Sequence, residues 1–332
     1  MMQTVEIHNT KKENENVQST EKVIDNKALD NPNPSGNNYC SLKQILWITL
    51  PITGVLLFAA IFIPIYVVSK NNEDEEPISE EYDEYEENIV NITYAILTPK
   101  GGYNNILIFL GGISDVSDKY FDFFKSKSTF VPKGTKIYFL SGQPREMQFI
   151  IDYYSDPSPV PGWFNIDSHA NLIPNHDFTE AQKSLKLVLD EIDRIKIAEN
   201  VEYKNIYLSG FSQGGMMTNY VLLNSRHQLG GYIAFSGYVF DHDFSENTII
   251  YKNDMTDTQK SKLQSRKDYH ILATHSFMDN AVFYQLSAES YRVYYSDYTD
   301  FKLLSFAALP HVLREQPVHP FVKKWLKESM GK

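Results

Sequence analysis

The amino-acid sequence predicts a mixed α/β protein built around a mostly parallel sheet. After Asn91, short apolar runs alternate with amphipathic stretches, the pattern of strands joined by crossover helices. One long helix is evident from its periodicity, and one apolar run leads through a glycine-flanked serine into a helical stretch. Parallel neighbours need such crossovers, so we expect helices on both faces of the sheet.

Seven apolar runs are the predicted strands, and helical stretches separate most of them. They lie at Ile92–Leu97, Ile106–Leu110, Lys136–Leu140, Asn205–Leu208, Tyr232–Phe235, Ile271–Thr274 and Lys302–Phe306. The helix predicted over Thr179–Ala198 has one apolar stripe, made by Leu185, Val188, Leu189, Ile192 and Ile195. Residues 241–267 are polar and are expected to form an inserted surface loop.

The first 69 residues are predicted to lie outside this domain. Residues 1–43 are rich in Asn, Lys, Glu and Ser, so we expect a disordered tail that buries too little apolar surface to fold. Residues 44–69 are expected to form a transmembrane helix, because Ile45 to Val68 carry no charge. At about 1.5 Å per residue this stretch covers roughly 36 Å, enough to cross a bilayer. A cleaved signal peptide or a buried core helix fits less well.

Residues 70–90 are predicted to be a disordered acidic linker, and residues 91–332 the globular domain. The run from Glu73 to Glu87 contains ten acids and no base, which should extend it by self-repulsion. Linked by 20 or so residues, the domain would stay near the bilayer.

The charges that flank the predicted transmembrane helix say little about its orientation in the membrane, because one lysine lies at each end, Lys43 and Lys70. The lysines of the short tail favour a cytosolic N-terminus and a domain in a lumen or outside the cell. Cys40 is then a candidate palmitoylation site, and Asn91 begins a glycosylation sequon. A lone juxtamembrane cysteine and a single sequon also occur by chance.

Charge and cysteine content exclude other classes. Residues 91–332 carry 25 bases and 26 acids without a basic run, which argues against nucleic acid as a partner. One cysteine in 332 residues permits no disulfide within the chain and no cysteine-based zinc cluster. No glycine-rich nucleotide loop follows a strand, and His169 with His176 is a weak metal candidate, so we expect no cofactor and no metal.

The segment Asn205–Gly215, NIYLSGFSQGG, carries the strongest chemical signal. Its G-x-S-x-G pattern lies between a strand and a helix, where a sharp turn can expose the Ser212 hydroxyl as a nucleophile. Glycines on either side relieve the crowding that such a turn creates. The backbone N–H of Gln213 can then face an oxyanion that develops on a substrate carbonyl.

A serine nucleophile needs a base and an acid that orients the base, and both follow in order. Asp279 comes after the Ile271–Thr274 strand, and His311 comes after the last strand. Asp279 could instead cap a helix that starts near Ala281. His319 is the main competitor for the base and is expected to be a surface cap, whereas His275 is expected to support the acid loop.

Residues 91–332 resemble the acyl-protein thioesterases and the related carboxylesterases and lysophospholipases of the α/β-hydrolases. GFSQGG matches the nucleophile turn of that family, His275–Val282 is similar to its H-G-x-x-D-x-x-V, and PGWFNI resembles its P-x-W-F-x-I. The resemblance implies an α/β-hydrolase fold and a triad of Ser212, Asp279 and His311. It also implies that Trp163 and Phe164 flank the substrate, although ordinary core aromatics fit the sequence equally well.

Departures from the family pattern concern loop shape. The family's H-G-x-G-D turn appears as GGISD, with Gly111 in place of the leading histidine. The N–H of Ile113 should still supply the second oxyanion donor, although the loss of the histidine could loosen the loop. Ser276, Asn280 and Phe283 replace a glycine and two prolines, which alters the acid loop and the acyl pocket.

Together these features predict a membrane-anchored serine hydrolase that cleaves esters or thioesters of acylated proteins or lipids. The alternative is a non-catalytic, membrane-anchored binding or assembly protein that retains the hydrolase fold. Within the enzyme class, the sequence does not choose among acyl proteins, lysophospholipids and small esters.

Overall fold

The computed structural model describes residues 3–5, 81–89, 92–116, 119–126, 129–155, 157–166, 177–240, 255–307 and 309–331. The predicted transmembrane segment, Cys40, Asn91, His169 and His176 lie outside these residues. Among the described residues, no helix is both long and apolar enough to cross a bilayer.

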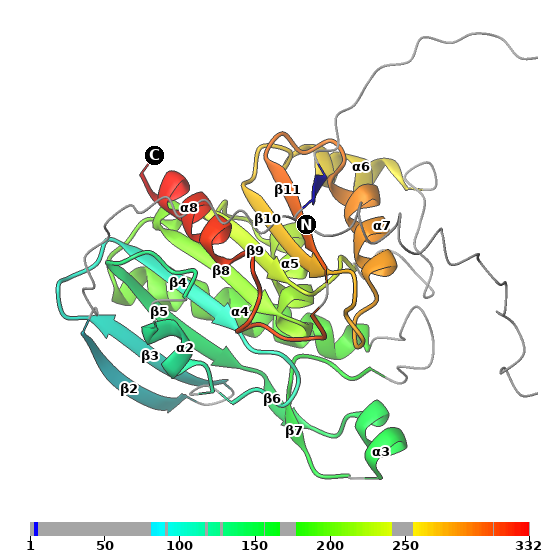
Figure 1. Ribbon diagram of the computed structural model, residues 1–332, viewed down its shortest axis with the longest axis horizontal. Coiled ribbons are helices and arrows are strands. Elements are labelled where there is room, and N and C mark those ends of the chain that lie inside the picture. Colours follow the sequence, from blue (N-terminus) through cyan, green and yellow to red (C-terminus); the bar gives the residue numbers. More distant parts are fainter. Residues whose placement is uncertain are drawn as a thin grey trace, which may run out of the picture. The chain divides into compact units, whose positions relative to one another are not determined.

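A nine-stranded sheet forms the centre of the described structure (Figure 1). Its strands lie in the order β1 (Gln3–Val5), β11 (Phe301–Phe306), β10 (Ile271–Ser276), β9 (Gly231–Phe235), β8 (Ile206–Phe211), β4 (Asn105–Leu110), β5 (Thr135–Ser141), β3 (Ile92–Pro99) and β2 (Tyr82–Ile89). The neighbours from β11 to β5 pair in parallel, and β1, β3 and β2 pair antiparallel. All seven predicted strands are confirmed.

Helices cover both faces of the sheet because its central strands are apolar on both sides. Along β4, Ile106, Ile108 and Leu110 belong to one buried cluster, and Leu107 and Phe109 belong to another. The first cluster includes residues of α4 (Phe178–Ala198), α5 (Gln213–Asn224) and α7 (Tyr284–Tyr295). The second includes residues of α2 (Phe121–Lys125) and α8 (His319–Met330).

The predicted helix over Thr179–Ala198 is confirmed as α4. Asp177 caps it, since its Oδ1 accepts the Glu180 N–H at 3.0 Å. Val188, Ile192 and Ile195 of the stripe are buried. The remaining described elements are β6 (Gln143–Arg145), α3 (Gln148–Tyr154), β7 (Val160–Gly162), a 3₁₀ turn over Tyr203–Asn205 and α6 (Asp257–Gln264).

Part of the segment expected to be a surface loop is helical. Residues 241–254 lie outside the described structure. In the last part of the predicted loop, α6 begins with a capping box. The Thr256 hydroxyl accepts the Gln259 N–H, and the Gln259 side chain accepts the Thr256 N–H. The polar composition of this stretch suggested a loop, but the hydrogen bonds of the capping box stabilise a helix there.

The prediction of a disordered linker is wrong for residues 82–89, which form β2. This strand pairs antiparallel with β3, in register from Tyr82 with Pro99 to Ile89 with Ile92. An edge strand is held by backbone hydrogen bonds and tolerates charged side chains, so acidic composition does not prevent pairing. An ion pair next to β2 offsets part of its negative charge: the Lys100 ammonium lies 3.1 Å from a Glu81 carboxylate oxygen. The compact unit therefore includes residues before 91.

The expected disordered tail is also wrong for its first residues. Gln3–Val5 form β1, which pairs antiparallel with β11 in a register that sets Thr4 opposite Leu304. Without it, the free edge of β11 would leave a row of backbone groups unpaired, and such an edge accepts a short strand of almost any composition.

Candidate active site

Ser212 lies at a sharp turn between β8 and α5. Its backbone has φ 56° and ψ −120°, a strained conformation for a residue with a side chain. The flanking glycines are needed for this turn: a Cβ on Gly210 would lie 2.3 Å from the Gly214 carbonyl oxygen, and one on Gly214 would lie 2.0 Å from that of Leu110. The crowding inferred from the G-x-S-x-G pattern is therefore present, and it is relieved as expected.

Asp279 and His311 are in direct contact. His311 Nδ1 lies 2.8 Å from Asp279 Oδ2 and 3.0 Å from Oδ1. Burial alone would raise the pKa of Asp279, but the hydrogen bond and charge of His311 hold that pKa below its ordinary value. The carboxylate is thus ionised and oriented to accept a hydrogen bond from the Nδ1–H of His311.

Asp279 also caps the segment that follows it. Its Oδ1 accepts the backbone N–H groups of Ala281 and Val282, at 3.0 and 2.8 Å. The cap and the contact with His311 therefore coexist in one carboxylate, and the two interpretations of Asp279 are not exclusive. These bonds fix the carboxylate that orients the imidazole.

His311 lies beside the nucleophile turn. Its ring contacts that of Phe211, the residue before Ser212, with ring centroids 4.7 Å apart. Its backbone N–H donates to Asn280 Oδ1 at 3.1 Å, which ties the base loop to the acid loop. Asn280 is one of the departures from the family pattern, and here it links the two loops. The carboxyl ends of parallel strands meet at one edge of the sheet, so loops after β8, β10 and β11 converge.

His275 supports the acid loop, as expected from the sequence. It is completely buried, and its Nε2 lies 2.8 Å from the Val282 carbonyl oxygen and 3.5 Å from Asp279 Oδ2. Burial lowers the pKa of its imidazole, which favours the neutral form. A neutral ring that donates to a carbonyl braces the loop.

The expectation that His319 is a surface cap is wrong. The residue is 4% exposed, and its ring lies 5.1 Å from that of Phe123 and 5.7 Å from that of Phe130. Burial lowers the pKa of this histidine to about 4. Its position just before an apolar helical stripe hid this burial, because Phe123 and Phe130 come from distant parts of the chain.

The two predicted oxyanion donors belong to segments that adjoin the nucleophile. Gln213 is the first residue of α5, and a Cβ on Gly112, the neighbour of Ile113, would lie 3.2 Å from Ser212 Cβ. Within the described residues, the backbone N–H groups of Ile113 and Gln213 donate to no other group of the chain. Two unused donors beside a nucleophile suit a developing oxyanion.

Trp163 and Phe164 are both fully buried, which favours the alternative that they are core aromatics. The Trp163 indole N–H donates to the Gly111 carbonyl at 2.8 Å, so this ring braces the loop before Ile113. The Gln213 side chain joins the same segment, since its Oε1 accepts the Trp163 N–H at 2.8 Å and its Nε2 donates to the Phe164 carbonyl at 2.6 Å.

Sequence reasoning missed Asp115. It is the last residue of the GGISD segment, and its carboxylate is buried and accepts the Gly112 N–H at 2.8 Å. A charged residue in an otherwise apolar and glycine-rich turn was the available signal.

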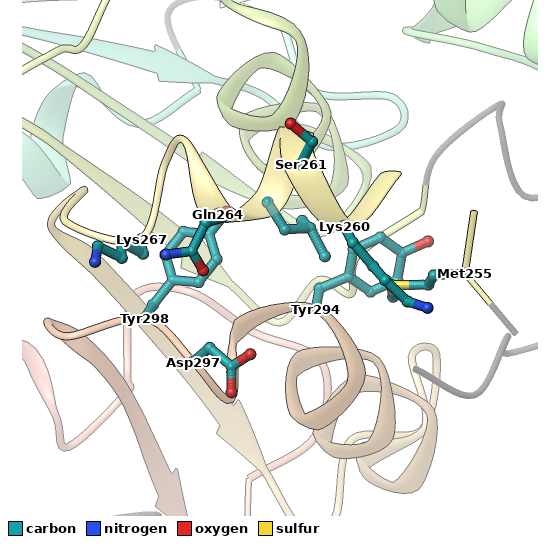
Figure 2. Close-up of a pocket in the computed structure, with 9 residues that line it drawn as sticks. Met255, Lys260, Ser261, Gln264, Lys267, Tyr294, Asp297 and Tyr298 are labelled. Carbon is teal, nitrogen blue, oxygen red and sulfur yellow. The ribbon is translucent and has the colours of Figure 1, made fainter. Parts of the chain in front are cut away.

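A cavity of about 380 Å³ lies apart from these residues, between α6 and the end of α7 (Figure 2). None of the candidate site residues lines it; its walls include Met255, Leu263, Tyr294 and Tyr298. Within the described part of the chain, no group of three or more His, Cys, Asp or Glu side chains is arranged to hold a metal ion.

Comparison with known proteins finds relatives in sequence and in structure. An acyl-protein thioesterase 1 of Kluyveromyces lactis is 28% identical over 173 residues, which cover 51% of this chain and 70% of that protein. The crystal structure of Zea mays acyl-protein thioesterase 2 has a TM-score of 0.55 at 16% identity, covering 72% of this chain and 99% of that one. That of Arabidopsis thaliana SOBER1 has a TM-score of 0.53 at 19% identity, covering 68% and 99%.

The two structures, at these identities, establish the shared α/β-hydrolase fold alone. The family assignment comes from the sequence. Residues 91–329, most of the chain, match the model of the Phospholipase/Carboxylesterase family. The chain therefore belongs to the phospholipase/carboxylesterase family and is a serine hydrolase of the ester and thioester class.

Proposed function

We propose that this chain removes acyl groups from esters or thioesters through a triad of Ser212, His311 and Asp279. The observation that carries the proposal is the hydrogen bond between His311 Nδ1 and the buried Asp279 carboxylate, beside a strained serine turn. This arrangement supports catalysis over the alternative of a non-catalytic protein that retains the fold, since a binding role needs neither the strained serine nor the oriented imidazole.

The chemistry follows from where the proton lies. With Nδ1 donating to Asp279, the neutral His311 ring carries its lone pair on Nε2, and this nitrogen accepts the Ser212 proton. Ser212 Oγ then bonds to the acyl carbon, and the carbonyl oxygen takes the electron pair. The N–H groups of Ile113 and Gln213 stabilise that oxyanion. His311 next protonates the leaving group, and water attacks the acyl-enzyme with the same histidine as base.

An acylated protein or lipid is the substrate class that we favour. The relatives named acyl-protein thioesterases support a protein substrate. The acid loop also exposes three large apolar side chains, those of Phe277, Met278 and Phe283, on either side of Asp279. Because Trp163 and Phe164 are buried, these exposed side chains are better placed to contact an acyl chain.

Membrane anchoring by residues 44–69 is part of this proposal, with the N-terminus cytosolic and the domain luminal or extracellular. Its support is the uncharged run from Ile45 to Val68. A single crossing separates residues 3–5 from β11, so in the anchored protein β1 does not pair with β11. Protease treatment of sealed vesicles tests the orientation. We expect the domain to be protected until detergent is added, and digestion together with cytosolic markers would reverse the assignment.

The triad is tested with a fluorophosphonate probe and an ester assay on the full chain. Ser212→Ala should abolish labelling and turnover, and His311→Ala should lower kcat by several orders of magnitude, because triad members act as one unit. Ser261→Ala, an exposed serine on α6, is the matched control and should label normally. Labelling or turnover that survives Ser212→Ala would refute the proposal.

A further inference from the structure

The loop after β4 holds two consecutive peptide groups beside the nucleophile. The first joins Gly111 to Gly112 and is fixed at both ends. Its carbonyl accepts the Trp163 indole N–H at 2.8 Å, and its N–H donates to Asp115 Oδ2 at 2.8 Å. This peptide can rotate only if both hydrogen bonds break.

The second peptide joins Gly112 to Ile113 and carries the proposed oxyanion donor. Its carbonyl accepts the Asp115 backbone N–H at 3.3 Å. A trans peptide is planar, so its carbonyl and N–H point in opposite directions. Holding the Gly112 carbonyl towards Asp115 therefore directs the Ile113 N–H away from Asp115. One residue further, the Ser114 N–H donates to the Pro161 carbonyl at 2.9 Å.

Asp115 is itself rigidly held. The residue is 2% exposed, and its carboxylate accepts the Tyr120 hydroxyl at 2.7 Å and forms an ion pair with Lys119. Burial and the adjacent carboxylate raise the pKa of Tyr120, so this phenol remains a neutral donor. The Arg314 guanidinium donates to the Lys119 carbonyl, which ties this loop to the one that carries His311.

The loop approaches the nucleophile too closely to tolerate much rotation. A Cβ on Gly112 would lie 3.2 Å from Ser212 Cβ and 3.1 Å from Asp115 Oδ2. A flip of the Gly112–Ile113 peptide would replace the N–H by a carbonyl, and a carbonyl oxygen would repel the oxyanion.

We propose that Asp115 and Trp163 are positioning residues that hold the Ile113 N–H towards the oxyanion formed on Ser212. They supply the rigidity that the replacement of the leading histidine by Gly111 was expected to remove. This inference rests on the proposed function of Ser212. Asp115 and Trp163 act through the backbone of the loop and do not touch the substrate themselves.

Two substitutions at Asp115 separate positioning from charge. Asp115→Leu keeps the branching of the side chain, with larger methyl groups in place of the oxygens, and removes the acceptor, whereas Asp115→Asn retains an oxygen that can accept the Gly112 N–H. Losing one oxyanion donor costs about 10²- to 10³-fold in kcat, so a misdirected donor in Asp115→Leu should cost roughly 10- to 100-fold. KM for a short p-nitrophenyl ester should change little, and Asp115→Asn should recover most of kcat.

A trifluoromethyl ketone provides a readout that a merely structural role would not move. Ser212 Oγ bonds to its carbonyl carbon, the Ser212 proton passes to His311, and the carbonyl π pair becomes the oxyanion. In Asp115→Leu the inhibition constant should rise by the same factor as kcat falls. Asp122→Ala is the matched control, because that carboxylate is 94% exposed on the neighbouring helix, and both constants should keep wild-type values.

Thermal unfolding of each variant is measured alongside, on the full chain. A folded Asp115→Leu with wild-type kcat and inhibition constant would overturn the inference. If that variant does not fold, Trp163→Phe decides, since it keeps a buried aromatic ring but removes the indole N–H that donates to the Gly111 carbonyl. It should show the same paired change in both constants. Ser212→Ala is assayed in parallel: activity that survives it refutes the proposed function, whereas Ser212-dependent activity with unaltered positioning variants refutes this inference alone.

Discussion

Replacing His319 with Phe should remove an acid-sensitive weakness in the core without impairing catalysis. The imidazole is packed among Phe123, Phe130 and Phe235, and within the described structure its Nε2 has no hydrogen-bond partner. It also begins α8, where the helix dipole disfavours a positive charge. A phenyl ring matches these neighbours and does not titrate.

The size of the expected loss in unfolding free energy at acidic pH follows from the lowered pKa of His319. Folding reduces that pKa from 6.5 to about 4, so the unfolded chain binds a proton more readily than the folded one. The stability that depends on a neutral imidazole is therefore complete above pH 6.5 and is lost as the pH falls towards 4. Each unit is worth about 1.36 kcal/mol, which makes the full loss about 3 kcal/mol and the loss between pH 7 and pH 5 about 2 kcal/mol.

Urea unfolding at pH 7, 6 and 5 measures this loss. The difference in unfolding free energy between wild type and His319→Phe should grow in favour of the variant by about 2 kcal/mol from pH 7 to pH 5. Any constant cost of the larger ring cancels in this comparison. Parallel losses in the two proteins would refute the reasoning. At pH 8 the variant should retain wild-type kcat, and inactivation would make His319 the base instead of His311.

Two further predictions concern the turn and the acid. Asp279→Asn should lower kcat on the order of 10⁴-fold in an ester assay, because the amide no longer fixes the His311 tautomer, and a loss below tenfold would contradict its role. Gly214→Ala should lower the thermal midpoint by at least 10 °C or prevent folding, since its Cβ would lie 2.0 Å from the Leu110 carbonyl oxygen. Gly101→Ala, whose Cβ would meet no atom within 4 Å, is the control and should melt like wild type.

Local sequence patterns determined most of the parallel sheet. The seven predicted strands and the long helix depend on the spacing of apolar residues, which reports burial directly. The serine turn was predictable for a different local reason. Its glycines must accommodate close backbone contacts that few other turns create. The order of Ser212, Asp279 and His311 indicated candidate chemistry, and the structure brings Asp279 and His311 into contact.

Tertiary structure decided what depends on neighbours distant in the sequence. The pairing of the acidic β2 with β3 was hidden because composition reports on side chains, whereas an edge strand is held by its backbone. His319 gave no sign of burial, since its aromatic neighbours belong to other segments. The hydrogen bonds of Asp115 and Trp163 to the loop before Ile113 likewise became visible only in three dimensions. Spacing along a chain reveals which residues are buried, but the partners of a polar group are set by the packing of separate elements.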